Sequence, residues 1–371
     1  MNKRIFIVAF FAFLFLAGSV YAAIGITELR TEQLKNPLGI DVRQPRLGWR
    51  IESDEQNVMQ TAYHILVASS ADLLAQGKGD IWDSGKIESD ASQWIAYQGK
   101  PLKRNARYYW KVKVYTNRGE ADWSAPAFWS MGLLNEADWQ GQWIGLDRTT
   151  PGDSETQWSR LAARYLRKEF ALSKEVKRAT VHIAGMGLYE LFINGQRIGD
   201  QVLAPAPTDY RKTILYNTYD VTPQLRKENA IGVTLGNGRF YTMRQNYKPY
   251  KIPTFGYPKL RLNLIVEYMD GSKETIATNT SWKLTTEGAI RSNNEYDGEE
   301  YDARKELGNW TQSGYDDKSW IAAQRVSIPS GTLRAQIMPG MKVMDTLKPV
   351  SIQKLGDKYI LDFGQNMAGW V

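Results

Sequence analysis

The feature that most constrains this chain is a series of short alternating strands joined by hairpin turns. Apolar and polar residues alternate at 188–193, Asn194-Gly195 is a residue pair that strongly favours a two-residue hairpin turn, and an apolar strand follows at 230–235. The same period of two returns at 107–115 and 260–268, whereas no segment longer than a turn or two repeats its apolar residues every 3.6 positions. The sequence therefore predicts an all-β protein.

Composition narrows the functions that such a chain can serve. The sequence has no cysteine, which excludes disulfides and thiolate nucleophiles, and its two histidines argue against a histidine-rich metal site or a Ser-His-Asp triad. Its 47 basic and 40 acidic residues are well mixed and form no basic block. We therefore expect no nucleic-acid partner.

The first 22 residues are typical of a secretory signal peptide. Lys3 and Arg4 precede an apolar run at 5–17, and small residues lead to Ala22, after which cleavage is expected. The apolar run is shorter than the roughly 20 residues needed to span a bilayer, and the sequence has no other such run. The pattern predicts a soluble periplasmic or extracellular protein that is free of the membrane once the leader is cleaved.

Three β modules are expected after the leader. Residues 23–134 hold several short strands, and their last part is similar to the end of a fibronectin type III domain. Residues 135–330 are predicted to form a jelly-roll β-sandwich. Residues 331–371 supply only the first strands of a further β-sandwich. Because one or two strands cannot bury an apolar face alone, we expect the chain to be a fragment, truncated within this third module.

The densest acidic segment, 294–306, supplies four candidates for a functional acidic loop: Asp297, Glu299, Glu300 and Asp302. An inverting glycosidase places two carboxylates about 6.5–9.5 Å apart on opposite sides of the sugar. Glu300 and Asp302 would lie roughly 6.6 Å apart on an extended strand but would face the same way, which disfavours a catalytic pair. Two other interpretations remain open: a calcium ion bound around Gly298, or ion pairs with neighbouring basic residues.

A second candidate site is the aromatic and basic segment 236–250. Sugars bind to aromatic faces flanked by fixed polar groups, so Arg239, Tyr241, Arg244 and Tyr247 are candidates for carbohydrate binding. The alternative is that this tyrosine-rich loop simply covers one end of the sandwich. Further along, Tyr315, Asp316 and Asp317 belong to a pattern that is often seen at the edges of carbohydrate-associated sandwiches.

Several of these motifs carry a resemblance to a known family. Residues 189–244, the segment YDGEEYDAR at 296–304 and the final segment 362–370 resemble the amino-terminal region of bacterial α-L-rhamnosidases. The resemblance implies a secreted glycoside hydrolase that removes terminal α-L-rhamnose from a glycan or glycoside with inversion. It also implies that the catalytic carboxylates lie in a downstream (α/α)₆ barrel.

The resemblance assigns no catalytic residue to this chain, because no position here matches the carboxylates of that barrel. The whole protein is expected to be an enzyme, and this chain alone is expected to be inactive without the missing catalytic domain as its partner. Two rival hypotheses remain open. One is a non-catalytic carbohydrate-binding or adhesion protein, which would bind sugar without turnover, and the other is a structural spacer, which would do neither.

Overall fold

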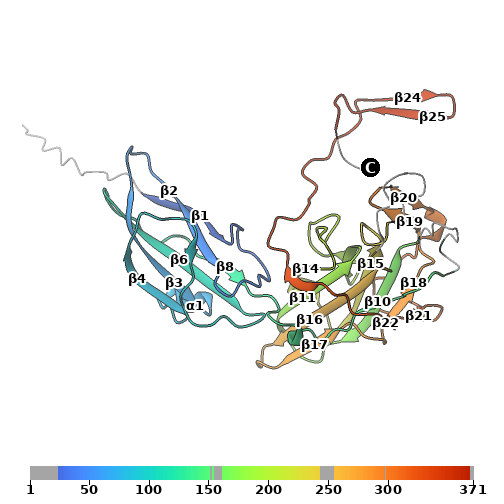
Figure 1. Ribbon diagram of the computed structural model, residues 1–371, viewed down its shortest axis with the longest axis horizontal. Coiled ribbons are helices and arrows are strands. Elements are labelled where there is room, and N and C mark those ends of the chain that lie inside the picture. The colour runs from blue at the N-terminus through green and yellow to red at the C-terminus, as the bar shows by residue number, and fades with distance from the viewer. Residues whose placement is uncertain (1–23, 151–152, 154–160, 243–254, 297, 368–371) are drawn as a thin grey trace, which may run out of the picture. The chain divides into compact units, whose positions relative to one another are not determined.

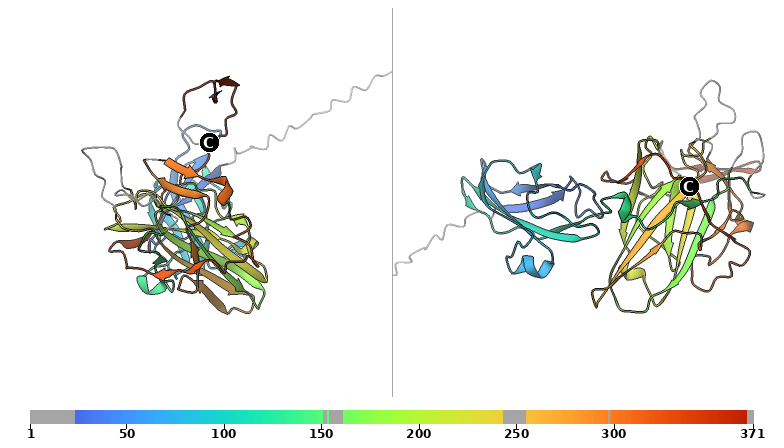
Figure 2. Two further views of the ribbon diagram at one scale, coloured as in Figure 1. Left: turned by 90° about the vertical axis from the view of Figure 1, so that its right-hand side faces the viewer. Right: turned by 60° about the horizontal axis from the view of Figure 1, so that its bottom comes forward.

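The computed structural model describes residues 24–150, 153, 161–242, 255–296 and 298–367 (Figures 1 and 2). The chain divides into two compact units. The first contains residues 1–30, 46–99 and 109–127, and the second contains residues 31–45, 100–108 and 128–371. The predicted leader lies outside the described residues. Within the described ranges, no helix has the length and apolar character needed to cross a membrane.

The first unit is built on two sheets. One sheet contains β1 (Gly25–Thr31), β2 (Arg46–Glu52) and β5 (Ile95–Ala96), and the other contains β4 (Trp82–Glu88), β3 (Gln60–Ala68), β6 (Arg107–Thr116) and β7 (Gly119–Glu120). Strand β8 (Ala127–Ser130) pairs with β6, but only its first residue belongs to this unit. A short helix, α1 (Ala71–Ala75), is capped by Ser70, whose hydroxyl accepts the N–H of Leu73. Along β6, Trp110, Val112 and Val114 are fully buried while Lys111 and Lys113 are not, as the alternating sequence predicts.

The second unit contains a larger β-sandwich. Its six-stranded sheet has the order β13 (Gln196–Arg197), β12 (Leu188–Ile193), β15 (Glu228–Gly236), β10 (Arg164–Ala171), β18 (Lys283–Thr285) and β21 (Ile321–Ala322). Its seven-stranded sheet has the order β22 (Gln324–Arg325), β9 (Ile144–Gly145), β16 (Lys259–Tyr268), β11 (Val176–Met186), β14 (Thr213–Asp220) and β23 (Thr332–Ala335), with β17 (Lys273–Ala277) beside β16. Three short 3₁₀ turns complete the connections: η1 (Glu136–Asp138), η2 (Thr222–Gln224) and η3 (Ala303–Lys305).

The main core lies between these two sheets. Leu166, Leu191 and Val233 project from the six-stranded sheet against Val181, Leu262 and Leu264 of the seven-stranded sheet, and all six are almost fully buried. Burial of each such side chain contributes about 1.5–3 kcal/mol. Strand β16 lies inside its sheet, because it pairs with β11 along nearly its whole length and with β17 and β9 on its other side.

The Asn194-Gly195 turn forms as predicted, with positive φ angles of 51° and 82° at its two residues. The turn connects β12 to β13, a strand of two polar, exposed residues that carries no apolar signal. The apolar strand that sequence analysis placed next, β15, instead pairs with the opposite edge of β12. A polar edge strand such as β13 therefore cannot be predicted from the alternation of apolar residues.

A long excursion between β18 and β21 covers the outer face of the six-stranded sheet. It contains the hairpin β19 (Ile290–Asn294) and β20 (Gly298–Tyr301), followed by a loop that carries Trp310 and Tyr315. Trp310 and Trp320 pack with Tyr165 of β10 in a second, smaller core. Gly232 of β15 allows this approach, because a Cβ atom there would lie 2.5 Å from Thr311 and 2.8 Å from Trp310.

The C-terminal segment forms one further hairpin, β24 (Ser351–Leu355) and β25 (Lys358–Asp362), which pair only with each other among the described strands. Ile352, Leu355, Tyr359, Ile360 and Leu361 are all exposed on it. The predicted all-β fold of tandem β-sandwiches is confirmed. The predicted domain limits, and the assignment of this hairpin to a third sandwich, stay predictions.

Burial of His182 makes the stability of the second unit depend on pH. The ring nitrogens of His182 lie 2.9 Å from the Thr218 hydroxyl and 3.1 Å from Oδ1 of Asn105, which belongs to the same unit. Burial, with a smaller contribution from the Arg178 charge, lowers the pKa of His182 to about 3. Between that pKa and the ordinary value of about 6.5, the unfolded chain binds a proton that the folded chain does not.

We therefore predict that the free energy of unfolding falls as the pH drops from about 6.5 toward 3, with His182 contributing up to about 1.4 kcal/mol per pH unit. Urea unfolding at a series of pH values should show a shallower dependence for His182→Gln. The control His64→Gln replaces a histidine of the first unit that pairs with Asp83. It should keep the steep dependence, and equal slopes for all three proteins would contradict the prediction.

Candidate functional site

The structure brings the two predicted site segments together. The segment that follows β15 meets the acidic hairpin β19–β20, and Asn237 joins them. Its backbone N–H donates to Oδ1 of Asn293 at 2.7 Å, and its side-chain amide donates to the carbonyls of Leu161 and Asn293, also at 2.7 Å. Asn237 is almost fully buried. Because a buried amide group is costly to leave unbonded, these contacts fix the segment to the hairpin.

Arg239 and Glu295 complete this junction at the surface. The Arg239 guanidinium donates two hydrogen bonds to the Glu295 carboxylate, at 2.6 and 2.8 Å, and both side chains are partly exposed. Beneath them, Tyr210 packs edge-on against Phe240 and Phe255. Burial, with a smaller effect of the nearby Glu295 charge, raises the pKa of Tyr210 to about 12, so its phenol stays neutral at physiological pH. We call this arrangement of segments 236–242 and 290–302 the loop–hairpin site.

Tyr241, a predicted carbohydrate-binding residue, lies inside the molecule. Its side chain is mostly buried and stacks on Tyr257, with ring centroids 5.5 Å apart and planes 26° apart. One aromatic face of Tyr241 is therefore covered by protein. Two further candidates, Arg244 and Tyr247, lie outside the described residues, as does the acidic candidate Asp297.

The remaining acidic candidates have different surroundings. Glu299 and Glu300 are exposed neighbours on β20, where successive side chains point to opposite faces. Partial burial and the nearby Glu190 carboxylate raise the pKa of Glu299. Asp302 caps η3 and accepts two hydrogen bonds of 2.8 Å from the Arg304 guanidinium, which holds its pKa near 2. Glu299 is thus more easily protonated than an ordinary glutamate, and Asp302 less easily than an ordinary aspartate.

The two open interpretations of the acidic segment can be compared with this geometry. Asp302 pairs with Arg304 and Lys305 pairs with Glu287, whereas Arg291 donates to the carbonyls of Thr286 and Gly288. For Asp302, these contacts match the interpretation that the acidic residues form ion pairs with neighbouring basic residues. In the described ranges, no three histidine or acidic side chains gather as ligands for a metal ion.

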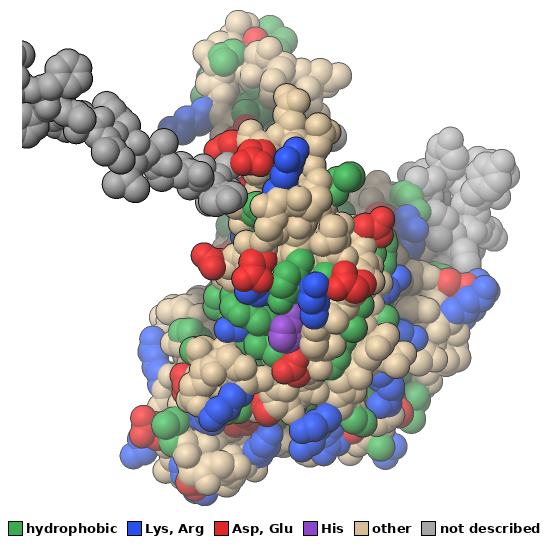
Figure 3. Space-filling model, turned by 90° about the vertical axis from the view of Figure 1, so that its left-hand side faces the viewer, with side chains coloured by type: hydrophobic (Ala, Val, Ile, Leu, Met, Phe, Trp, Pro, Cys, Tyr) green, Lys and Arg blue, Asp and Glu red, His purple; other side chains and the backbone are tan. Residues whose placement is uncertain are grey.

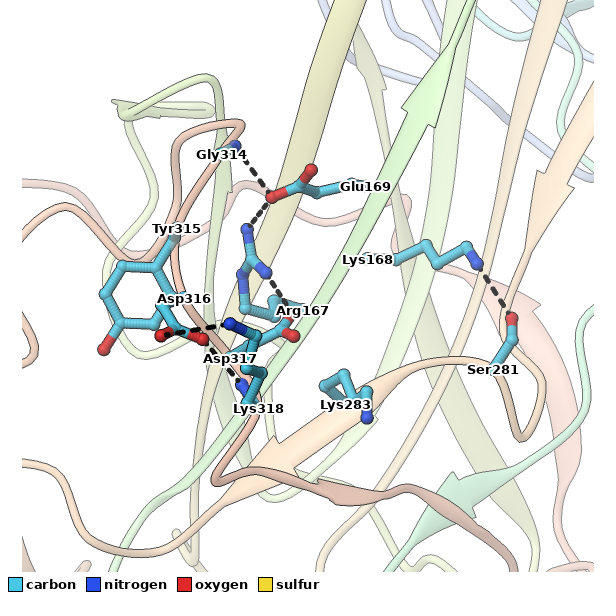
Figure 4. Close-up of a pocket in the computed structure, with 10 residues that line it drawn as sticks. All are labelled: Arg167, Lys168, Glu169, Ser281, Lys283, Gly314, Tyr315, Asp316, Asp317 and Lys318. Carbon is cyan, nitrogen blue, oxygen red and sulfur yellow. Dashed lines mark hydrogen bonds and ion pairs between the residues drawn. The ribbon is translucent and has the colours of Figure 1, made fainter.

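A pocket that sequence analysis did not locate lies beside the loop that follows the acidic hairpin (Figure 4). Its volume is about 550 Å³. It is lined by side chains from β10, from the start of β18 and from the loop: Arg167, Lys168, Glu169, Ser281, Lys283, Gly314, Tyr315, Asp316, Asp317 and Lys318. Tyr315, Asp316 and Asp317 are the residues whose pattern sequence analysis had noted. The sequence therefore contained a signal for the loop that lines one side of the pocket. It contained none for the strands that complete the pocket.

Arg167 organises one side of this pocket although its side chain is almost completely buried. Its Nε atom donates to the carbonyl of Trp310 at 2.9 Å, and Nη2 donates to the carbonyl of Gln312 at 3.0 Å and to Glu169 at 2.5 Å. Its Nη1 atom donates to Asp317, and the guanidinium lies over the ring of Tyr315 at 5.3 Å. A charged strand residue thus anchors the loop that closes the pocket.

Two family models match this chain. Residues 174–345 match the model of the alpha-L-rhamnosidase N-terminal domain, and residues 26–135 match a Rha78A-like, N-terminal immunoglobulin domain. This chain carries two domains of types found in the amino-terminal region of α-L-rhamnosidases. The resemblance drawn from the sequence motifs is therefore confirmed, and the first module is an immunoglobulin-like β-sandwich.

Several individual proteins are similar to this chain. An alpha-L-rhamnosidase of Formosa agariphila is 41% identical over 357 residues, which cover 91% of this chain and 37% of that protein. Among solved structures, an alpha-L-rhamnosidase from Dictyoglumus thermophilum has a TM-score of 0.82 and 39% identity over 92% of this chain and 38% of its own. Another from Streptomyces avermitilis, complexed with L-rhamnose, has a TM-score of 0.83 and 26% identity over 93% of this chain and 49% of its own. The chain spans less than half the length of each.

The loop–hairpin site yields a stability prediction. Asn237→Ala should lower the free energy of unfolding by about 1–3 kcal/mol, because it leaves the buried carbonyl of Leu161 and the part-buried carbonyl of Asn293 without their donor. Arg239→Ala should cost less than about 1 kcal/mol, because it removes only a partly exposed ion pair. Urea unfolding measures both values, and hydrogen exchange should show faster opening of β19–β20 only in Asn237→Ala. A larger loss in Arg239→Ala would contradict this account of the junction.

Proposed function

We propose that this chain is the amino-terminal part of an α-L-rhamnosidase that hydrolyses terminal α-L-rhamnosides. The observation that carries the proposal is the coverage of the relatives: the match extends over 91% of this chain but only 37% of the Formosa agariphila enzyme. A catalytic domain with its own acid and base is then supplied by the remainder of the protein. The proposed substrate class is a rhamnose-containing glycan or glycoside, which is supported by the complex of a similar α-L-rhamnosidase with L-rhamnose.

The arrangement of the described carboxylates supports a catalytic centre outside this chain. Glu299 and Glu300 are neighbours on one strand, and Asp302 is bound by Arg304. Hydrolysis with inversion needs an acid and a base about 6.5–9.5 Å apart, across a bound sugar. We propose that the reaction inverts the anomeric centre and that the protein is secreted through the leader at 1–22.

We further propose that the loop–hairpin site forms a surface that faces the catalytic domain or its substrate. Asn237 fixes the hairpin, so the partly exposed Arg239–Glu295 pair and Glu299 are presented on a stable base. Partial burial and the nearby Glu190 carboxylate raise the pKa of Glu299 above that of an ordinary glutamate. The candidates Tyr241, Arg244, Tyr247 and Asp297 belong to the same two segments of the sequence.

The activity can be tested with a simple aryl α-L-rhamnoside. We expect the longer natural protein to release L-rhamnose, with the β-anomer formed first in an NMR time course, and the chain of 371 residues to show no turnover. The non-catalytic alternative predicts instead that the longer protein binds rhamnosides without hydrolysing them. Turnover by this chain alone would contradict the assignment of catalysis to a downstream domain.

The role of the acidic hairpin can be tested separately in the longer protein. The double variant Asp297→Ala/Glu299→Ala should lower kcat/KM about tenfold or more while the melting temperature is unchanged, because contacts with substrate or its binding surface are lost. The control Glu175→Ala removes an exposed carboxylate far along the sequence from the hairpin and should change neither quantity. Unchanged turnover and unchanged melting of the double variant would remove the hairpin from the mechanism.

A further inference from the structure

We propose that the pocket beside Arg167 binds an acidic saccharide, whose carboxylate or sulfate group is held by Lys283. The proposal concerns a second site, distinct from rhamnoside hydrolysis, and it does not depend on the activity of the longer protein. It begins from the balance of charge in the pocket, where four basic and three acidic side chains line the walls.

Two of the three acidic side chains of the pocket are occupied by the buried Arg167 guanidinium, and the third, Asp316, is largely exposed. Glu169 and Asp317 both bind the buried Arg167 guanidinium, and Glu169 also accepts the backbone N–H of Gly314 at 2.9 Å. Asp316 accepts the backbone N–H of Lys318 at 3.2 Å, and the ammonium of Lys318 lies 3.9 Å away. Arg167 in turn has its donors directed at these acids and at two backbone carbonyls. In the part of the chain that the structure describes, these acids pair with Arg167 and Lys318 rather than with Lys168 or Lys283.

Lys283 and Lys168 are those remaining cations. They come from the neighbouring strands β18 and β10, and both residues have intermediate exposure, with the contact of the Lys168 ammonium exposed to solvent. Lys168 donates to the neutral hydroxyl of Ser281 at 3.0 Å. The backbone of Lys283 pairs in the sheet, and its side chain makes no hydrogen bond or ion pair with the described residues. Partial removal of an ammonium from water is unfavourable without a compensating anion. An oxyanion from a ligand supplies that compensation through charge-assisted hydrogen bonds.

The rest of the lining fits a sugar better than a free inorganic ion. The pocket volume of about 550 Å³ is in the range of small-ligand sites. In Figure 4, Tyr315 and Asp316 lie on one side of the pocket, with Lys168 and Ser281 on the other. The Arg167 guanidinium covers one face of the Tyr315 ring, which leaves the other face for a ligand. An aromatic face beside fixed hydroxyl and ammonium groups is a combination that binds saccharide rings. We assign the acidic group to Lys283, and further sugar hydroxyls to Lys168 and Ser281.

Isothermal titration calorimetry of the purified protein tests the proposal with four probes. These are methyl β-D-glucuronide, glucose 6-sulfate, neutral methyl β-D-glucoside and inorganic sulfate. At least one acidic sugar should bind at least about tenfold more tightly than either the neutral sugar or the inorganic ion, because only an acidic sugar satisfies both parts of the pocket. Equal binding of the neutral sugar would overturn the role of charge, and equal binding of sulfate would overturn the role of the sugar.

Two variants test whether the acidic sugar binds at Lys283. Lys283→Ala should weaken the acidic sugar about tenfold or more, whereas Lys177→Ala, which removes an exposed lysine of β11, should leave its affinity unchanged. Circular dichroism confirms that both variants fold. In the unmodified protein, the same sugar should slow acetylation of Lys283 and Lys168 but not of Lys177, as measured by mass spectrometry. Unaltered affinity in Lys283→Ala, or no protection of Lys283, would overturn the proposal.

Discussion

The buried guanidinium of Arg167 is the interaction on which much of the second unit depends. A charge enclosed by protein is unfavourable unless it is paired and fully hydrogen-bonded, and Arg167 meets this condition with two carboxylates and two backbone carbonyls. Those partners lie on β10 itself and on the loop 310–317, so the same bonds hold the loop over the sheet. Removal of one partner from such an arrangement typically costs about 3–5 kcal/mol, which makes the loop position strongly determined.

The excursion 290–320 shows how a β-sandwich acquires a functional surface on a face that would otherwise meet water. Trp310 and Trp320 supply apolar burial against β10, while Asn237 supplies hydrogen bonds to the hairpin. Apolar contacts are non-directional, but buried polar groups must find partners of defined geometry, so the polar groups set the positions of the segments. This one covering segment contributes residues both to the loop–hairpin site and to the pocket beside Arg167. Figure 3 shows another face, on which acidic and basic side chains are interspersed.

The sequence predicted features that depend on local chemistry. Alternation identified β6 and β16, and the preference of Asn-Gly for positive φ identified the turn after β12. Polar strands of two residues, such as β13, were missed because they bury no apolar side chain. The pocket was missed because Arg167 and Tyr315, which meet in it, are far apart in the sequence. An arginine within a strand is also expected to be exposed to solvent unless its distant partners are known. Local patterns therefore predicted elements and candidate segments, whereas long-range polar contacts decided how they meet.

The central claim is that these two domains belong to a longer α-L-rhamnosidase whose catalytic residues lie elsewhere in the protein. The most direct measurement is the mass of the native protein in the chromatographic fraction that carries rhamnosidase activity, detected with an antibody against this chain. The account predicts that the antibody and the activity coincide in one polypeptide much larger than 42.2 kDa. A native protein of about that mass, separated from all rhamnosidase activity, would contradict it.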